Sequence, residues 1–532
     1  MATDDFFRAR LDGMVDPRHP LVVLASRMPW PQIEAALAPA LAHKDRKGRT
    51  VEGADMFGPT LSVAGAGVSA AGRPRLPIRL MVSLLYLKHA FNESDESLVQ
   101  RWSENVVWQL FSGLEYYSTK LPCDPAQISR FRKILGEAGV EQLLKTTIET
   151  AVAIKAVNKA EFERVIVDTT VQDNEVAAKA HIGAADVKLR SSGRSHKAIA
   201  HPTDSRLLDV ARRLVVRHAQ RAGIALKMTY EREGKTLRRR AGGYAHAKQF
   251  KRLKTVVKRQ RTILGVLIRE VTRKMEQMTT LAADIKAKLM TWLERAERIR
   301  TQKTKDKNKL YAMHAPEAEC IGKGKARKPY EFGVKASIAV THRKGLVVGA
   351  RTFPGNPYDG HTLAAQIEQT STLLENIGVK PTTAVVDMGY RGIDEDVPAV
   401  QVIHRGKAKR LTAQQKTWLR RRQAVEPTIG HLKADHRMDR CWLKGTEGDA
   451  LHAALCAAGF NIRWLMRAIA QQAAKAAKAF VFVLFGLWSW LQMALGVRYA
   501  TIRQAISSED RVARPVGTPV LGDRQRMVGV AG

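Results

Sequence analysis

Three carboxylates stand at positions from which they could serve a metal-dependent reaction at phosphorus. Asp168 ends the apolar run at 165–167, and Asp387 ends a similar run at 384–386. Short continuous apolar runs are typical of buried central strands, so each aspartate should emerge at the edge of a sheet. Together with Glu426 they would supply the hard oxygen ligands that Mg²⁺ prefers. Two such ions can activate the attacking oxygen and stabilise the leaving oxygen at a phosphodiester.

Glu426 lies in a strongly basic segment, RRRQAVEPTIGHLKADHR, at positions 420–437. Pro427 predicts the first residue of a helix, where its missing N–H costs nothing, and this places Glu426 at the helix entrance. Lys433 would then lie two turns further along the same face. Such a face could offer a carboxylate to a metal ion and an ammonium group to a phosphate. A solvated amphipathic helix with a capping glutamate is the alternative interpretation.

Other polar residues are explained better without a metal. His404, His431 and His436 have no matching cysteine or histidine partners nearby in the sequence, so we do not expect zinc there. Asp204 and Asp359 lie in Pro-Thr-Asp and Tyr-Asp-Gly, where turn and cap roles account for both carboxylates.

The charge of the chain points to a polyanionic partner. Its 532 residues include 88 Lys and Arg against 51 Asp and Glu, a formal net charge of +37. The commonest partner for such a charge is a nucleic-acid backbone, although a basic surface without this function is the alternative. The length allows several domains. The four cysteines form no CxxC pair, which indicates a reducing compartment and argues against a zinc ribbon or a disulfide scaffold.

The apolar segments predict a cytoplasmic protein. The first residues contain no apolar core of signal-peptide length. Only residues 479–495, AFVFVLFGLWSWLQMAL, resemble a membrane span, and their length is marginal. We therefore expect a buried or partner-facing helix there and no membrane association. The final residues, from about 503, lack periodicity and aromatic side chains, which predicts disorder.

A helical region is predicted between residues 76 and 155. Its last helix has a clear start signal, Asp124 followed by Pro125, with Gln127 at the capping-box position. Basic residues just after this start fit a helix-turn-helix-like DNA-binding domain, although most compact helical domains do not bind DNA. The candidate DNA contacts are Arg130, Arg132 and Lys133.

A second basic region contains eleven Lys or Arg and no acid between Lys235 and Arg261. Apolar residues recur at an interval of seven from Phe250 to Trp292, which predicts one long helix, or two in a hairpin, with a coiled-coil-like seam. Because the charges have one sign, we favour a DNA-tracking face over a solvated face. The candidate DNA contacts are Lys248, Lys251, Arg252 and Lys254.

The strand signals predict an α/β fold. Runs at 330–340 and 346–353, joined by a short turn, predict an antiparallel hairpin. A helical pattern, the second buried strand and a short strand at 399–404 follow. The Gly- and Pro-rich turns of residues 1–75 predict a loosely structured N-terminal region. A helical DNA-binding domain (76–155) is predicted to follow it. A catalytic domain (160–172 and 328–470) comes next, interrupted by a loop and basic helical insertion (173–327), and an apolar helix with a disordered tail (471–532) ends the predicted order.

Many segments in one order carry a family resemblance: FNESDESLVQRW, CDPAQISRFRKILGE, VIVDTTVQ, KAIAHPTDSRLL, YAHAKQFKRLK, RKPYEFGVK, GNPYDGHTL, VVDMGYRG, HRGKAKR and RRRQAVEPTIGHLKADHRMDRCWLKG. They resemble the DDE transposases of bacterial insertion sequences, in the group named after insertion sequences four and five. The resemblance covers nearly all of residues 6–470.

The resemblance implies an RNase H-like catalytic domain, a mixed sheet with flanking helices, with Asp168, Asp387 and Glu426 as catalytic acids that hold two Mg²⁺ or Mn²⁺ ions. Arg422 matches the family's arginine four residues before the glutamate, and Lys433 its lysine seven residues after. The implied activity is cleavage of double-stranded DNA at terminal inverted repeats and strand transfer into a target. The implied assembly is a homodimer or larger homo-oligomer, associated with the bacterial nucleoid.

Two departures from the family pattern leave rival functions open. Leu419 replaces the tyrosine expected three residues before the arginine, and residues 173–196 intervene directly after the first acid. This insertion is either a harmless loop or an impairment of the site. A catalytically inactive relic would bind DNA without metal-dependent nicking. A structure-selective nuclease would cleave DNA without forming joined products.

Overall fold

The computed structural model describes residues 9–41, 76–173, 201–278, 281–303, 305–307, 309–322 and 330–494. The chain divides into two units, residues 1–468 and 469–532. Nearly all of the predicted loop at 173–196 and all of the predicted disordered tail lie outside the described residues.

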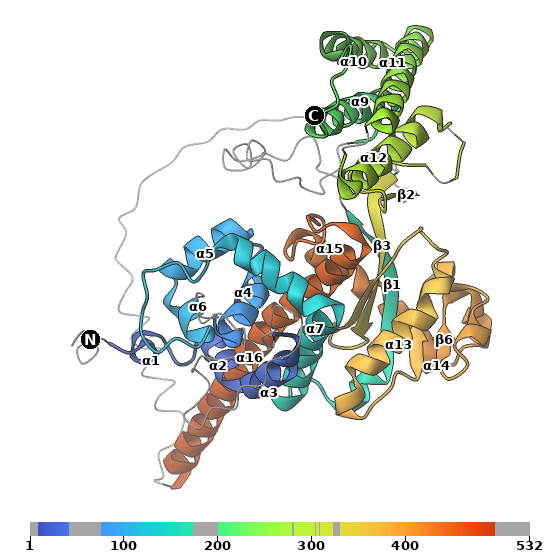
Figure 1. The fold of residues 1–532 in the computed structure, drawn as a ribbon. Helices are drawn as coiled ribbons and strands as arrows, with labels where there is room; N and C mark the ends of the chain where they lie inside the picture. Colours follow the sequence, from blue (N-terminus) through green and yellow to red (C-terminus); the bar gives the residue numbers. More distant parts are fainter. Residues whose placement is uncertain are drawn as a thin grey trace, which may run out of the picture. The chain divides into compact units, whose positions relative to one another are not determined.

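A six-stranded mixed sheet lies in the first unit (Figure 1). Its order is β2-β3-β1-β5-β6. β4 also pairs with β3, along residues 335–340, beyond the residues of β3 that pair with β2. β3 is antiparallel to β1, β2 and β4, whereas β1, β5 and β6 are parallel. The strands are β1 Arg164–Asp173, β2 Glu319–Gly322, β3 Tyr330–Thr341, β4 Val347–Phe353, β5 Thr383–Val385 and β6 Gln401–Ile403.

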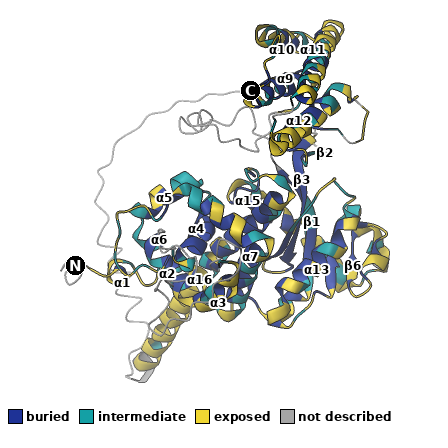
Figure 2. Ribbon diagram, in the orientation of Figure 1, coloured by how far each residue is buried: buried dark blue, intermediate teal, exposed yellow. Residues whose placement is uncertain are grey.

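The apolar runs of the sequence form the inner strands, which are coloured as buried in Figure 2. Val165, Ile166 and Val167 of β1 are fully buried between β3 and β5. The predicted hairpin is confirmed as β3 and β4, and the shorter runs form β5 and β6. With helices packed on this mixed sheet, the α/β class is also confirmed.

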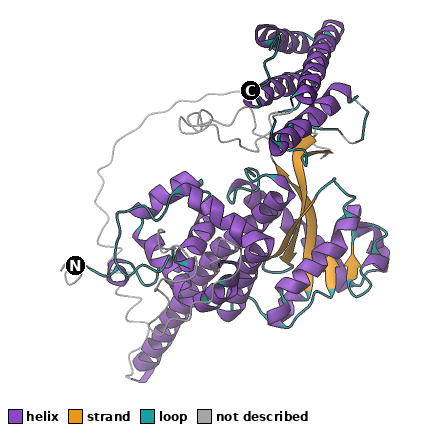
Figure 3. Cartoon of the chain, viewed as in Figure 1, coloured by secondary structure: helices purple, strands orange, loops and turns teal. Residues whose placement is uncertain are grey.

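Helices pack against the sheet (Figure 3). α13 (Leu363–Leu373) contacts β3 and β4, α7 (Pro125–Ala153) contacts β4, and α15 (Val425–Ala434) contacts β1. The other helical elements of this region are η3 Lys159–Phe162, η4 Gly360–Thr362, η5 Glu375–Ile377, η6 Met388–Tyr390, η7 Asp394–Asp396, η8 Arg405–Arg410, α14 Ala413–Arg420, η9 Arg421–Ala424 and α16 Gly445–Ala494.

Two side-chain amides cover the outer side of β4. Asn461 of α16 accepts a hydrogen bond from the Val347 backbone N–H (3.1 Å) and donates to the Val347 carbonyl (2.8 Å). Gln369 of α13 forms the same pair with Ala350, at 3.0 and 3.3 Å. Both amides are buried. The backbone of β4 is therefore satisfied at these two positions without another strand.

The region expected to be helical between 76 and 155 contains α4 (Ile78–Ala90), α5 (Asp95–Glu104), α6 (Val106–Phe111) and α7. α7 begins as predicted, with a capping box formed by Asp124 and Gln127. Gly136 interrupts α7 with a φ of 61°, a conformation that favours glycine.

Residues 9–41 correct the expectation of a loosely structured N-terminal region. They form α1 (Leu11–Met14), α2 (Pro20–Arg27), α3 (Trp30–Leu37) and η2 (Pro39–Leu41). Leu21, Leu24 and Ile33 are buried. The prolines suggested turns, but Pro20 opens a helix, at a position where proline removes no intrahelical hydrogen bond.

Most of the described part of the predicted insertion, 173–327, is a bundle of four helices, α9 (Asp204–Arg221), α10 (Glu231–His246), α11 (Phe250–Gln277) and α12 (Ala283–Thr301). β2, near the end of that range, belongs to the sheet instead, so the predicted boundary at 327 lies too late in the chain. Leu264, Leu267 and Val271 lie in its core. The seven-residue seam is only partly confirmed, because Phe250 and Ile285 are 60% and 38% exposed. α11 ends at Gln277 and α12 packs against it, so the two-helix alternative is correct.

The second unit contains the exposed apolar end of α16. Phe482 is 78% and Trp490 65% exposed, so the expectation of a buried helix at 479–495 is wrong for its described residues. A partner-facing role stays a prediction. By length and composition, the helix Gly445–Leu491 could span a membrane, although a single such helix is a weak indication.

A buried ion triad joins three helices of the first unit. The Asp95 carboxylate of α5 lies 2.6 Å from Lys88 Nζ of α4 and 2.6 Å from an Arg132 guanidinium nitrogen of α7. Burial alone would raise the pKa of Asp95, but Lys88 and Arg132 hold it well below its usual range. Asp95 is therefore ionised in the folded chain at neutral pH, and its charge compensates buried cations.

We predict that Asp95→Asn lowers the free energy of unfolding by about 3–5 kcal/mol, because Lys88 and Arg132 remain buried without their partner. Urea unfolding at neutral pH measures the loss. Glu104→Gln, at an exposed acid of α5, is the control. The folded-state pKa of Asp95 is depressed, so its contribution is complete above the ordinary value of 3.8 and declines as the pH falls through the lowered value. An Asp95→Asn chain as stable as the control would contradict the prediction.

Candidate active site

The pairing of β1 with β5 brings Asp168 and Asp387 to matching positions. The strands are parallel, with Val165 opposite Ala384 and Ile166 opposite Val385. Asp168 and Asp387 are each two residues beyond the last of these pairs. However, Asp168 does not end its strand as the sequence suggested, because β1 continues to Asp173 alongside β3. The two acids come to matching positions because each lies two residues beyond the last pair of β1 and β5.

Arg422 links Asp168 to Glu426. Its Nη1 lies 3.3 Å from Oδ2 of Asp168, and its Nη2 lies 3.2 Å from Oε1 of Glu426. The Asp168 and Arg422 side chains are only 17% and 18% exposed, whereas Glu426 is 60% exposed. One guanidinium thus spans the acids of β1 and α15, which lie on either side of it.

The helix that carries Glu426 begins slightly earlier than predicted. α15 starts at Val425, so Glu426 and Pro427 are its second and third residues. Pro427 still lies in the first turn, where backbone N–H groups have no intrahelical partner, so the helix tolerates it. Arg422 lies in η9, the short turn before α15.

The chain turns sharply after Asp387. Oδ1 of Asp387 accepts a hydrogen bond from the Gly389 N–H (2.8 Å). A Cβ at position 389 would lie 3.0 Å from carboxylate oxygens of both Asp387 and Asp359, so glycine permits their approach. Tyr390 is fully buried. Burial, together with the charges of Asp168, Asp359 and Asp387, raises the pKa of Tyr390 well above its ordinary value, so its phenol stays neutral.

Asp359 adds a fourth carboxylate that the sequence did not assign to the site. It directly precedes η4, but its side chain does not cap that turn, so the predicted cap role of the carboxylate is wrong. Instead, Oδ1 accepts hydrogen bonds from Thr169 Oγ1 (2.9 Å) and Lys335 Nζ (2.8 Å). Thr169 follows Asp168 in β1, and Lys335 is buried in β3. No local sequence signal links these positions, because the contact depends on the pairing of β1 with β3.

Lys433 is held by a buried acid. Its Nζ lies 3.1 Å from Oε2 of Glu331, whose side chain is 9% exposed. Glu331 belongs to β3, so this ion pair fixes α15 against the sheet. A phosphate near Lys433 would therefore meet an ammonium group that is already oriented.

Asp168, Asp387 and Glu426 fit the chemistry of a hard divalent cation. All are carboxylates, they come from β1, the end of β5 and α15, and each is at least partly exposed. The guanidinium between Asp168 and Glu426 indicates a negative electrostatic potential, which would also attract a metal cation. A cation bound by those two oxygens would compete with Arg422, so its binding would free the guanidinium for a phosphate.

The predicted DNA contacts in α7 have unequal surroundings. Arg130 and Lys133 are exposed, as a phosphate contact requires. Arg132 is only 3% exposed and pairs with Asp95. We therefore correct its assignment to a structural one, because its guanidinium faces the interior of the helical region.

The predicted contacts of the bundle are exposed. Lys248 precedes α11, and Lys251, Arg252 and Lys254 lie in its first turns. The basic run is not wholly uncompensated, because Glu231 and Glu233, just before it, each pair at 2.7 Å with one of its cations, Lys235 and Arg259.

The sequence also did not predict a basic hollow on the first unit. It has a volume of about 980 Å³, and its lining includes Arg164, Arg343, Lys344 and Arg420. The Arg164 guanidinium lies 3.3 Å from the ring centroid of Trp418, which also lines the hollow. Its residues come from the start of β1, the β3–β4 turn and α14 to η9, so only the folded chain brings these charges together.

The three histidines considered for zinc have other partners. His431 Nδ1 lies 2.7 Å from the Asp435 carboxylate, and His436 Nδ1 donates to the His89 carbonyl at 2.8 Å. His404 accepts from the Gly406 N–H at the start of η8.

Comparison with known proteins gives two family matches. Residues 54–134 match a family described as "Transposase domain", and residues 296–462 match one described as "Transposase DDE domain". The second match includes Asp387, Arg422, Glu426 and Lys433 but not Asp168. The chain is also 37% identical over 247 residues to "Uncharacterized protein ORF8 in nfe locus" of Rhizobium meliloti, covering 46% of this chain and 95% of that protein. No solved structure matches the chain.

We predict that Asp168→Asn weakens Mn²⁺ binding to the chain at least about tenfold, because it removes one anionic ligand of the cation. Calorimetric titration without DNA measures the dissociation constant. Asp396→Asn, at an exposed acid of η7, is the matched control and should bind as the unaltered chain does. Equal affinities for the two variants would remove Asp168 from the cation site.

Proposed function

Because the chain belongs to the DDE transposases of bacterial insertion sequences, we propose that it cuts DNA at the terminal inverted repeats of a mobile element and joins the freed ends to a target. Transposases act on DNA, and this chain has the charge to bind it. The observation that carries the proposal is the Arg422 bridge between Asp168 and Glu426, beside the position to which the β1–β5 register brings Asp387.

The topology supports an RNase H-like interpretation of the catalytic domain. Three antiparallel strands, β4, β3 and β1, are followed in the sheet by the parallel strands β5 and β6. We further propose that the chain belongs to the group named after insertion sequences four and five, on the motifs quoted from its sequence. Within this fold the proposed catalytic domain comprises 160–172 and 328–470, together with β2, which the sequence had placed in the 173–327 insertion.

In the proposed reaction, Asp168, Asp387 and Glu426 would hold two Mg²⁺ or Mn²⁺ ions. When bound, the ions activate the attacking oxygen and stabilise the leaving oxygen. Water attacks first and frees a 3′-hydroxyl at the element end. That hydroxyl then attacks a phosphodiester of the target, which releases one target strand end by transesterification.

The basic residues of the site position phosphates in this proposal. Arg422 offers a planar fork that matches two phosphate oxygens once the acids have taken up cations. Lys433 acts as a fixed point charge because Glu331 orients its ammonium group. Neither side chain needs to change its protonation state during the reaction.

The surfaces proposed for DNA binding lie on separate helical elements. Arg130 and Lys133 of α7 would contact the inverted repeats, together with Lys248, Lys251, Arg252 and Lys254 of the bundle. The pairing of two element ends requires at least a homodimer. The family suggests a cytoplasmic protein, and we infer that it is associated with the nucleoid.

The inactive-relic alternative is not favoured. Its argument was that an insertion at 173–196 displaces Asp168, yet Asp168 remains paired with β3 and bridged to Glu426 through Arg422. The nuclease alternative shares the proposed site, and only the presence of joined products separates it from the transposase.

We predict that Glu426→Gln abolishes Mg²⁺-dependent nicking and joining of a labelled fragment carrying the element end, with a loss of at least about a hundredfold, while DNA binding is retained. Gel assays of cleavage, joining and binding test each step. Glu395→Gln, at an exposed acid of η7, is the control. If the unaltered chain binds the fragment but neither nicks nor joins it, the proposal is wrong and the relic interpretation holds.

We predict that Arg343→Ala with Lys344→Ala weakens DNA binding similarly for all sequences, because the hollow would contact the phosphate backbone. The slope of the logarithm of the association constant against the logarithm of the salt concentration should become smaller in magnitude by about one for each lost side chain that contacts a phosphate. Lys303→Ala with Lys305→Ala removes the same charge from exposed positions elsewhere and is the control. Equal losses in the two double variants would mean that net charge, and not the hollow, determines the affinity.

A further inference from the structure

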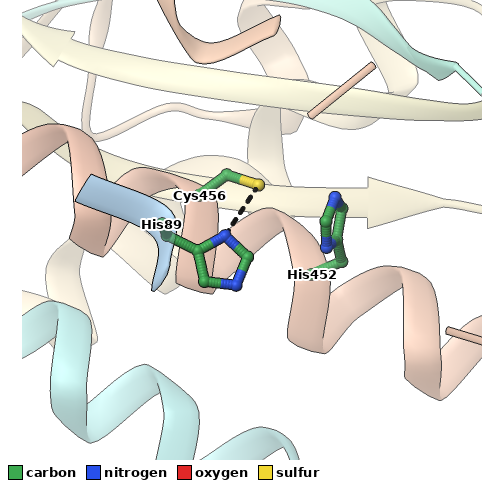
Figure 4. A group of neighbouring side chains, drawn as sticks. All are labelled: His89, His452 and Cys456. Carbon is green, nitrogen blue, oxygen red and sulfur yellow. Dashed lines mark hydrogen bonds between the residues drawn. The ribbon is translucent and has the colours of Figure 1, made fainter. Parts of the chain in front are cut away.

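A second cluster of possible metal ligands lies inside the first unit, built from soft ligands. His89 of α4 faces His452 and Cys456 of α16 (Figure 4). His452 and Cys456 are four residues apart, so they lie on one face of the helix. The three residues are 1%, 5% and 0% exposed, and one potential ligand atom from each lies within 4.8 Å of the others.

The distances within the cluster suit a tetrahedral ion. Cys456 Sγ lies 3.6 Å from His89 Nδ1. An ion with Zn–S near 2.3 Å and Zn–N near 2.1 Å, at a tetrahedral angle, separates sulfur from nitrogen by about 3.6 Å. The sulfur–nitrogen separation between Cys456 and His89 is therefore already that of a tetrahedral site. The separations from His452, at most 4.8 Å, need to contract by about 1.4 Å at most.

The Nε2 nitrogen of His452 is hydrogen-bonded to a backbone carbonyl, as is usual for a histidine that binds a metal through its other nitrogen. His452 Nε2 lies 2.7 Å from the Arg437 carbonyl oxygen, which can only accept, so Nε2 carries the hydrogen. The lone pair of the neutral ring is then on Nδ1, available to a metal. Histidine ligands of metals usually donate their other N–H to a carbonyl or a carboxylate in this way.

Close packing fixes the two helices that would share the ion. A Cβ at Gly459, three residues after Cys456, would lie 2.5 Å from the backbone carbon and Cβ of His89, so only glycine permits this approach of α16 to α4. His436 Nδ1 also donates to the His89 carbonyl at 2.8 Å. His89 Nδ1 in turn lies 3.4 Å from the His436 carbonyl oxygen, and a metal bound through Nδ1 would replace this longer contact. His89 Nε2 is buried without a hydrogen-bond partner in the described part of the chain.

A neighbouring pocket offers access and a fourth ligand. His452 lines a cavity of about 270 Å³, which has room for water. Lys88, Arg132 and Arg437 also line it, and their charges oppose a bare dication. Burial raises the pKa of the Cys456 thiol, an effect that Arg437 and Lys88 only partly offset, so the ion itself has to displace the thiol proton. A thiolate-bound ion adds only one net positive charge. Asp95, paired with Lys88 and Arg132, offsets part of it.

We propose that His89, His452 and Cys456 form a structural site for Zn²⁺ or a similar thiophilic divalent ion, with water from the pocket as the fourth ligand. Binding replaces the Cys456 thiol proton, which leaves to solvent, with the metal. The ion cross-links α4 to α16. The nitrogen and sulfur ligands distinguish this site from the carboxylate site, whose oxygen ligands suit Mg²⁺.

The test titrates the full-length, metal-stripped chain with Co²⁺ and with Zn²⁺, without DNA. We expect thiolate-to-cobalt charge-transfer absorption that saturates at one ion per chain and is displaced by Zn²⁺. Zn²⁺ should also raise the melting temperature by a few degrees at saturation. Cys456→Ser should lose the absorption and the melting shift. Cys123→Ser, at a buried cysteine outside the cluster, is the matched control and should retain both.

Two outcomes would overturn the proposal. One is a titration of the unaltered chain that gives no thiolate–cobalt absorption, whatever the variants do. The other is absorption that persists undiminished in Cys456→Ser. If Cys456→Ser does not fold, His452→Gln serves instead and should shift the cobalt spectrum and weaken Zn²⁺ binding at least about tenfold. Because DNA cleavage is not measured, failure here is distinct from failure of the transposase proposal.

Discussion

The parallel pairing of β1 with β5 is the constraint on which the candidate active site depends. It brings Asp168 and Asp387 to matching positions, and the antiparallel pairing of β1 with β3 adds Lys335 and Asp359. α15 brings Glu426 to the same place because the Lys433–Glu331 ion pair holds that helix to β3. A shift of one residue in the β1–β5 register would turn one aspartate to the opposite face of the sheet. The acids can therefore act together only while the sheet keeps this register.

The sequence was sufficient where local patterns determine structure. The apolar runs at 165–167 and 384–386 lie in β1 and at the end of β5, since few other elements tolerate continuous burial. It was insufficient where a side chain's role depends on distant partners. Arg132 follows a helix start, as a DNA contact could, yet Asp95 holds it inside. Asp359, the basic hollow and the His89 cluster each combine residues from separate segments, so no spacing in the sequence reveals them.

The helical region at 76–155 and the helix α16 that follows the sheet are joined by buried polar contacts as well as by apolar packing. α4 meets α16 at His89 and Gly459, and α7 meets it through the Asn461–Thr147 hydrogen bond. Such contacts cost free energy unless every partner is in place, so they favour one docking geometry over alternatives of similar apolar area. A helical region that contacts DNA would thus transmit its position to the sheet through a defined set of contacts.

The amides of Asn461 and Gln369 limit how copies of this chain can assemble. By pairing with Val347 and Ala350 they act as short stretches of an absent neighbouring strand. An exposed strand edge invites pairing with another chain, which can lead to orderly sheet extension or to aggregation. At β4 either outcome would first have to displace two buried amides. Pairing between copies through β4 is therefore disfavoured, and a dimer of this chain would form more readily through another surface.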